Sequence, residues 1–534
     1  MDFLTAPGSP EQLEGFVWTS VLEQLRTRYM APHLETRRNI KRAFSDYIAA
    51  LNETALAHLK PETEEYDRAL SPFLERWQSD LTQYVPRLLR MVKPRRDINT
   101  VLFIDNVDQL SPAYQAQIFV LAQRATRMIG SITIVALREE SYYGASVQRI
   151  FTAYVNRQFH IASPHFRRLI SNRINFALRY LATETGELFQ TATRAPGDRT
   201  AIEDFLRIVE YSIFEHNRNI ARLIEAVCFG NMREALKMFA MFLVSGATDV
   251  EKMLRIYRRD GQYFVAFHEF VKAVMLGDRK YYKETTSPIM NVFDCAGDKN
   301  ASHFTALRIL KLLLAHRGES DRVGRGYVDV SRVVNAFDDI FDNRDDVVRT
   351  LNRLVTRQLV ETNTRSTETI EGASHVRVTS AGWYYWRFLV RAFAYLDLVL
   401  QDTPINDSGT EGDLRQSVHD VDNLSDREEE KLRRMQVRFE RVDLFLRYLS
   451  SEEDEERRLF DLGRHQSVIA EAVMPAINEQ FHHERAWIMK RVQENRERFK
   501  EDIQIAAPEE ELQGLIDEEE GSEGEESDAP PDAR

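Results

Sequence analysis

The chain has 534 residues, of which 43% are hydrophobic and 29% are charged, and its formal net charge is −13. This length exceeds what one hydrophobic core can organise, so we expect about two to four domains. Two cysteines, Cys228 and Cys295, exclude a disulfide framework and a cysteine-based zinc site, and they are typical of a reducing cytoplasm. The negative charge argues against non-specific nucleic-acid binding by the chain as a whole.

Residues 1–16 lack a basic region followed by an apolar run, so no signal peptide is expected. No window of about 18 apolar residues exists, and the apolar run at 389–400 is interrupted by Arg391 and Asp397. We therefore expect a cytoplasmic protein without a membrane partner.

Residues 101–104, Val-Leu-Phe-Ile, end at Asp105, and this pattern is typical of a central parallel strand buried on both faces. Ser111 and Pro112 then predict the N-cap and the first residue of a helix. Residues 131–139, which are β-branched and apolar, predict a second strand. The order strand, helix, strand follows.

A third short strand is expected at 157–162. Strands that alternate with helices imply a parallel α/β sheet, whose ligand site lies at the carboxyl ends of its strands. Asp105, Asp108 and Arg138 all fall at these ends. The sequence therefore predicts a site at this edge of the sheet.

These three residues suit a nucleoside triphosphate. Asp105 is expected to hold the water shell of Mg²⁺, and Asp108 to orient or activate the attacking water. Arg138 would offer a fork of donors to phosphate oxygens. The alternatives are that Asp105 only starts a turn and that Arg138 forms an ion pair with Asp105, Glu139 or Glu140.

Between residues 301 and 400 the expected order is helix, helix, helix and β-hairpin, which is that of a winged helix-turn-helix. The third helix, over 344–361, has an apolar stripe opposite a polar face. DNA contacts are expected from Arg349, Asn352, Arg353 and Arg357 on that polar face. The alternatives are a solvated helix face or a protein-binding surface, because residues 301–400 carry only 14 Lys and Arg against 12 Asp and Glu.

Three segments resemble, in this order, the Walker B, sensor 1 and sensor 2 motifs of AAA+ and STAND ATPases. They are VLFIDNVDQ at 101–109, ITIVALRE at 132–139 and FGNMREALKMF at 229–239. The last is similar to the lid helix of the replication-initiator branch, so the resemblance implies that Arg233 contacts the phosphates and that Asn231 shapes the start of the helix beside the cofactor. ATP and Mg²⁺ are the implied cofactors. The alternative for Arg233 is a solvent-facing helical residue.

The implied fold is an α/β P-loop NTPase core with an incomplete parallel sheet, followed by mainly α domains. We expect the core at 1–163, a helical lid at 164–248, connecting helices at 249–300, the winged helix-turn-helix at 301–400, C-terminal helices at 413–505 and a disordered acidic tail at 506–534.

The sequence departs from this family in two places. Asn106 stands where AAA+ proteins usually have a catalytic Glu, so Asp108 is expected to substitute or hydrolysis to be slow. No Gly-x-x-x-x-Gly-Lys-Ser/Thr phosphate loop occurs in the chain. We expect that Met1 falls inside the domain and that a segment of about 30 residues or more, one βα unit, precedes it. A late start codon, a split gene and true degeneration are the alternative causes.

The sequence thus predicts an ATP-binding switch of the AAA+/STAND type that couples its nucleotide state to the winged helix. It is an ATPase only if the missing phosphate loop is supplied, and the chain alone should bind ATP weakly or not at all. The resemblance also allows a second copy as a partner, with Arg149 or Arg157 as an arginine finger; the alternative, which the sequence favours, is that both are ordinary surface arginines. Proteins contacted by the C-terminal helices are further expected partners. The alternatives are a non-enzymatic DNA-binding or interaction scaffold and a defence or signalling NTPase.

Overall fold

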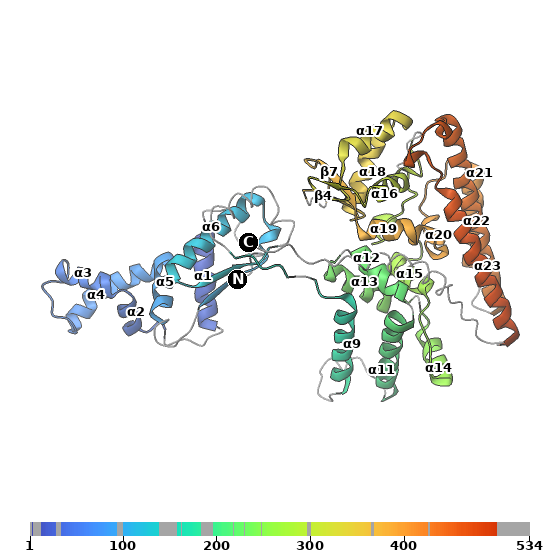
Figure 1. Ribbon diagram of the computed structural model, residues 1–534. Helices are drawn as coiled ribbons and strands as arrows, with labels where there is room; N and C mark the ends of the chain where they lie inside the picture. Colours follow the sequence, from blue (N-terminus) through green and yellow to red (C-terminus); the bar gives the residue numbers. More distant parts are fainter. Residues whose placement is uncertain are drawn as a thin grey trace. The chain divides into compact units, whose positions relative to one another are not determined.

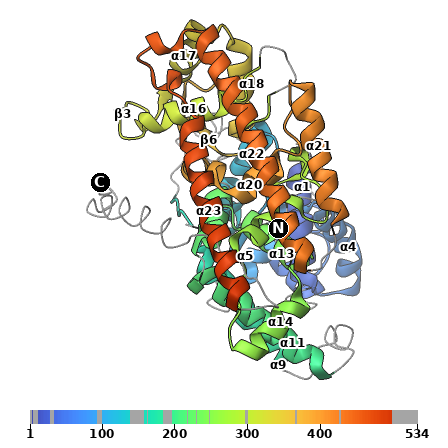
Figure 2. The ribbon, with the colours of Figure 1, turned by 90° about the vertical axis from the view of Figure 1, so that its right-hand side faces the viewer.

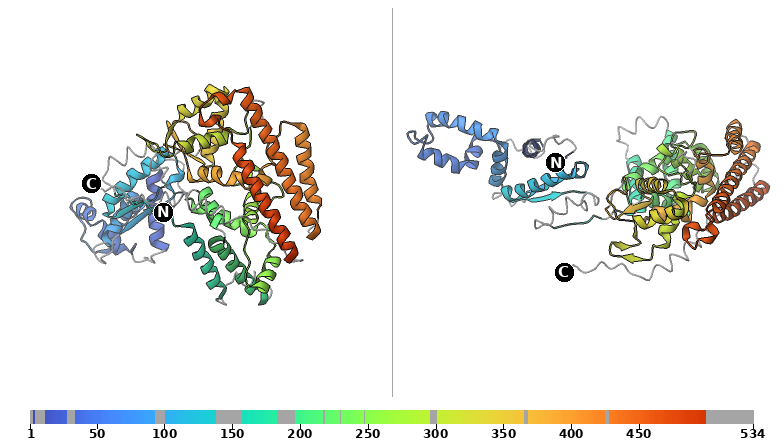
Figure 3. Two further views of the ribbon diagram at one scale, coloured as in Figure 1. Left: turned by 45° about the vertical axis from the view of Figure 1, so that its right-hand side comes forward. Right: turned by 90° about the horizontal axis from the view of Figure 1, so that it is seen from above.

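The computed structural model of the chain describes residue 3 and residues 12–27, 34–92, 100–137, 157–161, 163–182, 196–216, 218–228, 230–246, 248–295, 301–364, 368–424 and 428–498. The chain divides into two compact units, Met1–Phe159 and His160–Arg534, and each is described by itself. Both are mainly helical, with small sheets of two or three strands (Figures 1 and 3). Within the ranges given, no helix combines the length and apolar character that crossing a bilayer requires.

The helices of the first unit pack with its strands around one apolar core. Thr36 and Thr63 accept backbone N–H bonds at the starts of α2 and α4, as N-cap residues do. Phe44 is fully buried and its ring stacks on Trp77, with the ring centroids 5.1 Å apart. The helices before the sheet are α1 (Leu13–Thr27), α2 (Arg37–Ala43), α3 (Ser45–Glu53), α4 (Glu64–Ser79) and α5 (Leu81–Val92).

The strand, helix, strand prediction is confirmed. β1 (Val101–Ile104) and β2 (Ile132–Val135) pair in parallel, and α6 (Pro112–Ile129) connects them. Gly130 ends α6 in a left-handed conformation, with φ at 65°, and donates its N–H to the carbonyl of Thr126. The carboxyl ends of the two strands therefore lie next to each other.

The sheet is buried on one face only, so the prediction that β1 is buried on both faces is wrong. Leu102 and Ile104 lie in the core that α5 and α6 share, where they are 7% and 1% exposed. The side chains on the opposite face are 40–61% exposed, namely Val101, Phe103, Ile132 and Ile134. The reason is that, among the described residues, this sheet has two strands and a helix on one side.

The third predicted strand is also wrong for the residues that the structure describes. Residues 157–161 have no regular secondary structure, and Phe159 and Ile161 are 84% and 90% exposed. A strand requires a neighbouring strand with which to form hydrogen bonds, and none of the described strands pairs with this segment.

The second unit begins with helices whose apolar stripes form a shared core. Ile170, Leu223 and Phe270, from three different helices, are fully buried in it. The helices are α9 (Phe166–Ala182), α11 (Pro196–Tyr211), α12 (Arg218–Cys228), α13 (Met232–Val244), α14 (Val250–Asp260) and α15 (Phe267–Leu276), with a π-helical turn at Ser212–His216.

The three helices and the later β-hairpin predicted for residues 301–400 occur in the predicted order, whereas the short strands between the first and second helices were not predicted. A three-stranded antiparallel sheet of order β5-β7-β6 packs with three helices, and a short hairpin follows the first helix. The elements are α16 (Thr305–Ala315), β3 (Ser320–Asp321), β4 (Gly324–Arg325), β5 (Val328–Asp329), α17 (Val330–Phe341), α18 (Arg344–Thr356), β6 (Val360–Thr362), β7 (His375–Val378) and α19 (Ser380–Arg387).

The C-terminal helices pack on the same core, and α22 and α23 run side by side (Figure 2). A buried ion pair joins α22 to α16, since Arg308, 1% exposed, lies 2.6 Å from the carboxylate of Glu456. The helices are α20 (Phe393–Val399), α21 (Ser408–Asn423), α22 (Glu428–Leu459) and α23 (Met474–Arg498). The expected tail at 506–534 lies outside the described residues.

Candidate functional site

Asp105 stands at the carboxyl end of β1, on a turn that presents it to solvent. The next residue, Asn106, is left-handed, with φ at 62°, and its backbone N–H donates to Oδ1 of Asp105 at 2.9 Å. A non-glycine residue at positive φ is uncommon and changes the chain direction sharply. The turn ends on Val107, which is 1% exposed, so a buried residue anchors the loop while the Asp105 side chain stays accessible.

Asp108 lies three residues further on and is half-buried. The buried side chain of Gln115, from α6, donates to the backbone carbonyl of Leu110 at 2.8 Å and so ties this loop to the helix. The two carboxylates therefore share one short loop at the edge of the sheet where ligands of parallel sheets bind.

The N-terminal end of the described chain lies beside this loop. The backbone N–H of Phe3 donates to the carbonyl of Asp105 at 3.1 Å, and the Phe3 ring is fully buried against Phe16. On the β2 side, the N–H of Ala136 donates to the carbonyl of Ile104 at 2.9 Å. The pairing of β1 with β2 thus continues past the last strand residue.

The structure does not place the arginines expected in this site next to Asp105 and Asp108. Arg138 and Arg149 lie outside the described residues, and Arg157 is exposed. Arg233 belongs to the second unit, so its approach to Asp105 stays a prediction.

Arg233 is exposed in the first turn of α13, and the residues before it build the start of this helix. Gly230 is left-handed, with φ at 78°, and its carbonyl accepts from the Ser163 hydroxyl at 2.7 Å. Oδ1 of Asn231 accepts the backbone N–H groups of Arg233 and Glu234 at 3.1 and 3.3 Å. Asn231 therefore acts as an N-cap, and its contact with a nucleotide stays a prediction.

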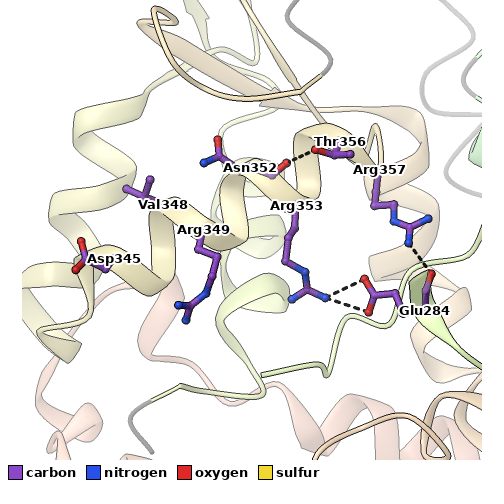
Figure 4. Close-up of a pocket in the computed structure, with 8 residues that line it drawn as sticks. All are labelled: Glu284, Asp345, Val348, Arg349, Asn352, Arg353, Thr356 and Arg357. Atoms are coloured by element: carbon purple, nitrogen blue, oxygen red, sulfur yellow. Dashed lines mark hydrogen bonds and ion pairs between the residues drawn. The ribbon is translucent and has the colours of Figure 1, made fainter. Parts of the chain in front are cut away.

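The polar face of α18 is not a free strip, so the interpretation of this face as solvent-facing is wrong for its C-terminal half. Arg353 donates to both carboxylate oxygens of Glu284, at 3.0 and 3.1 Å (Figure 4). It also lies 2.8 Å from the carboxylate of Asp294. Arg357 donates to the backbone carbonyls of Ser287 and Glu284 at 2.8 and 2.7 Å. Both guanidinium groups hold the 284–294 segment against the helix.

The 284–294 segment is part of the core, because Ile289, Met290 and Phe293 are fully buried. Burial raises the pKa of Glu284, against the opposing effect of the Arg353 guanidinium. Arg353 and Arg357 are therefore needed to compensate a buried carboxylate and buried carbonyl groups.

The N-terminal half of the same face is more open. Arg349 is half-exposed and pairs with Asp346 at 2.7 Å, while Oδ1 of Asn352 accepts the backbone N–H of Ile370 at 2.8 Å. Together these side chains line an open groove of about 560 Å³. Its lining residues are Glu284, Asp345, Val348, Arg349, Asn352, Arg353, Thr356 and Arg357. Acidic side chains offset the arginines, so the groove is not the strongly basic surface that duplex DNA favours.

The sequence analysis did not predict a second buried ionic cluster, which joins α20 to α22. Asp397 is 1% exposed on α20, and each of its carboxylate oxygens pairs with one arginine of α22, Arg438 at 2.7 Å and Arg441 at 2.6 Å. Burial raises the pKa of Asp397, but the two guanidinium groups outweigh burial and hold the pKa below its usual value. The acid that interrupts the apolar run at 389–400 was the available signal.

Comparison with protein-family models, with curated proteins and with solved structures finds no significant match to this chain. Among the residues that the structure describes, no three His, Cys, Asp or Glu side chains gather as a metal centre requires. Mg²⁺ can also be held through bound water by one carboxylate, which this criterion does not address, and Asp105 is an exposed carboxylate.

Proposed function

We propose that the chain belongs to a nucleotide-controlled switch, in which the first unit contributes one edge of a nucleoside triphosphate site. The observation that carries this proposal is the β1-α6-β2 unit, whose first strand ends on the exposed Asp105 in a left-handed turn. Parallel sheets bind ligands at this edge, and an acid there suits hydrated Mg²⁺.

Each residue has a separate role in this proposal. Asp105 would hold Mg²⁺ through its water shell, and the ion would supply positive charge for the phosphates; Asp108 would orient the attacking water. Arg138 and Arg233 bind phosphate oxygens, and the Asn231 cap fixes the first turn from which Arg233 extends. Movement of α13 on the nucleotide would then be passed to the rest of the second unit.

We infer further that residues 301–400 form a winged helix-turn-helix that serves mainly as a protein-contacting element. This is supported by the element order and by the internal partners of Arg353 and Arg357. Of the predicted DNA-contacting residues, only Arg349 and Asn352 would then contact DNA directly. They lie beside Asp345 and Asp346, whose carboxylates would repel phosphate.

The nucleotide proposal is tested by ligand-observed NMR of ATP with Mg²⁺, because the absence of a Gly-x-x-x-x-Gly-Lys loop makes us expect only weak, about millimolar, binding. Asp105→Asn should abolish the saturable signal. Glu75→Gln, which neutralises an exposed acid on α4, is the matched control and should leave the signal unchanged. Binding that is equal in both variants contradicts the proposal, and micromolar affinity contradicts our interpretation of the missing loop.

The second candidate is a non-enzymatic interaction scaffold that retains an ATPase-like fold. It is favoured by the lack of a phosphate loop in the sequence and by the structural use of Arg353 and Arg357. If ATP does not bind at all, and Asp105→Asn changes no partner property of the chain, the scaffold explanation is preferred.

A further inference from the structure

Helix α9 carries an unusual combination of charge and exposed aromatic surface. Residues 141–183 contain six arginines, eight aromatic residues and no Asp or Glu, although the chain has 84 acidic and 71 basic residues. Four of these arginines lie on α9. This local excess of positive charge is the reverse of the charge of the whole chain, so it indicates an anionic partner.

One side of α9 is buried and the other carries the cations. Phe166, Ile170 and Ile174 are buried in the core, and α9 contacts α11 and α12. Figure 1 shows α9 and α11 next to each other. With 3.6 residues per turn, Arg168 and Arg179 fall on the opposite side, and both are exposed. Arg167 pairs with Glu215 and is therefore not counted with them.

Arg173 completes the set of exposed cations on this helix. Within the described residues, Arg168, Arg173 and Arg179 form no ion pair with a carboxylate, so their charge is not compensated there as that of Arg353 is.

The aromatic side chains lie on the same exposed surface. Phe176 is 63% exposed and Tyr180 is 36% exposed. Their rings are stacked, with centroids 6.3 Å apart and planes at 21°. A ring exposed to this extent gains little from its own fold, and a flat ring between arginines is suited to stacking with a nucleobase.

We propose that α9 binds single-stranded nucleic acid, with Arg168, Arg173 and Arg179 on the phosphates and Phe176 against a base. Stacking requires the face of an unpaired base, so duplexes should bind much more weakly. None of these side chains reads the sugar, so DNA and RNA strands of similar sequence should bind alike. This inference does not rest on the nucleotide proposal, because it uses other residues.

The test is fluorescence anisotropy of the full chain with labelled 20-residue oligonucleotides, poly-dT and poly-U, and with a duplex of the same length. Three phosphate contacts on a single strand predict an affinity loss of about 20-fold between 50 and 200 mM salt. Phe176→Ala should weaken binding about fivefold to 100-fold. Arg168→Gln with Arg179→Gln should weaken it and also reduce its salt dependence.

The controls remove exposed cations and an exposed apolar side chain elsewhere on the second unit, although both control arginines, unlike Arg168 and Arg179 among the described residues, are paired with a glutamate. Arg415→Gln with Arg433→Gln neutralises two cations whose side chains are 80% and 58% exposed, and Val244→Ala trims an apolar side chain that is 83% exposed. These variants should bind as the unchanged chain does. Circular dichroism should show the same helix content for every variant, because all the altered side chains are on the surface.

Three results would overturn the proposal. The first is no binding of either single strand at 50 mM salt, and the second is equal affinity for the duplex. The third is that the α9 variants and the control variants weaken binding to the same extent. Saturable single-strand binding that depends on both Phe176 and the arginines supports it.

Discussion

Replacing Arg353 by alanine should destabilise the second unit, because this arginine compensates two acids at once. Its Nη2 donates to both carboxylate oxygens of Glu284, it forms a further ion pair with Asp294, and its side chain is 24% exposed. The side chains of Glu284 and Asp294 are 15% and 30% exposed. Removal of the guanidinium leaves both carboxylates without this ion-pair partner, and only the more distant charge of Arg357 still acts on Glu284.

Breaking a buried ion pair by removal of one partner costs about 3–5 kcal/mol of the free energy of unfolding. Water reaches part of this cluster, so we expect Arg353→Ala to lower that free energy by about 2–4 kcal/mol. Glu284→Gln in the same chain should restore part of the loss, since one of the uncompensated charges is then absent. The exposed pair of Arg349 with Asp346 should contribute less than about 1 kcal/mol.

The assay is urea unfolding followed by tryptophan fluorescence, combined with hydrogen exchange of the amides at 284–294. Arg353→Ala should lower the unfolding midpoint and accelerate exchange in this segment. Arg349→Ala, on the same helix, is the control and should do neither. If the two variants behave alike, Arg353 has no structural role and the polar face of α18 is again available to DNA.

Three further changes test other parts of the fold. Asp397→Asn should cost about 3–5 kcal/mol in urea unfolding, because it leaves its two arginine partners uncompensated in the core; a loss below about 1 kcal/mol would contradict this. Gly382→Ala should be destabilising by about 1–3 kcal/mol, since an added Cβ would lie 2.3 Å from the carbonyl oxygen of Leu359, and an unchanged melting temperature would argue against so close an approach. Burial raises the pKa of Glu484 to about 7. The protonated side chain therefore adds to the free energy of unfolding below about pH 4.5, and this contribution should be lost as the pH rises through 7. Glu484→Gln can still accept the N–H of Phe393 and should remove this loss when the free energy of unfolding is measured over a pH series. If the unchanged chain and Glu484→Gln give parallel curves of this free energy against pH, the explanation is wrong.

The local patterns of the sequence predicted the β1-α6-β2 unit but were wrong about a strand at 157–162, because the described residues 157–161 have no regular structure. The apolar residues 101–104 and the proline at the start of α6 were sufficient for the parallel unit, because strand ends and helix starts depend on nearby residues. The burial of β1 was harder to predict, because an apolar strand has the same composition whether one face or both faces of its sheet are covered. The bare face of β1, with Phe103 at 54% exposure, therefore could not be read from the sequence.

The role of the α18 face could not be predicted for a similar reason. A helix with Arg349, Arg353 and Arg357 on one side looks the same whether it faces solvent, DNA or the chain itself. The partner of Arg353 is Glu284, which is 69 residues away in the sequence, and no local pattern connects them. In contrast, the cap at Asn231 follows from residues that adjoin it, and the structure shows the side-chain bonds that such a residue normally forms.

The most direct measurement is photo-crosslinking of the chain with a γ-phosphate azidoanilide of ATP in the presence of Mg²⁺, followed by peptide mapping. If Asp105 and Arg233 line one triphosphate site, label should appear in both 101–109 and 229–239, and excess ATP should suppress it. Label that is confined to one of these segments, or that ATP does not displace, would contradict a shared nucleotide site.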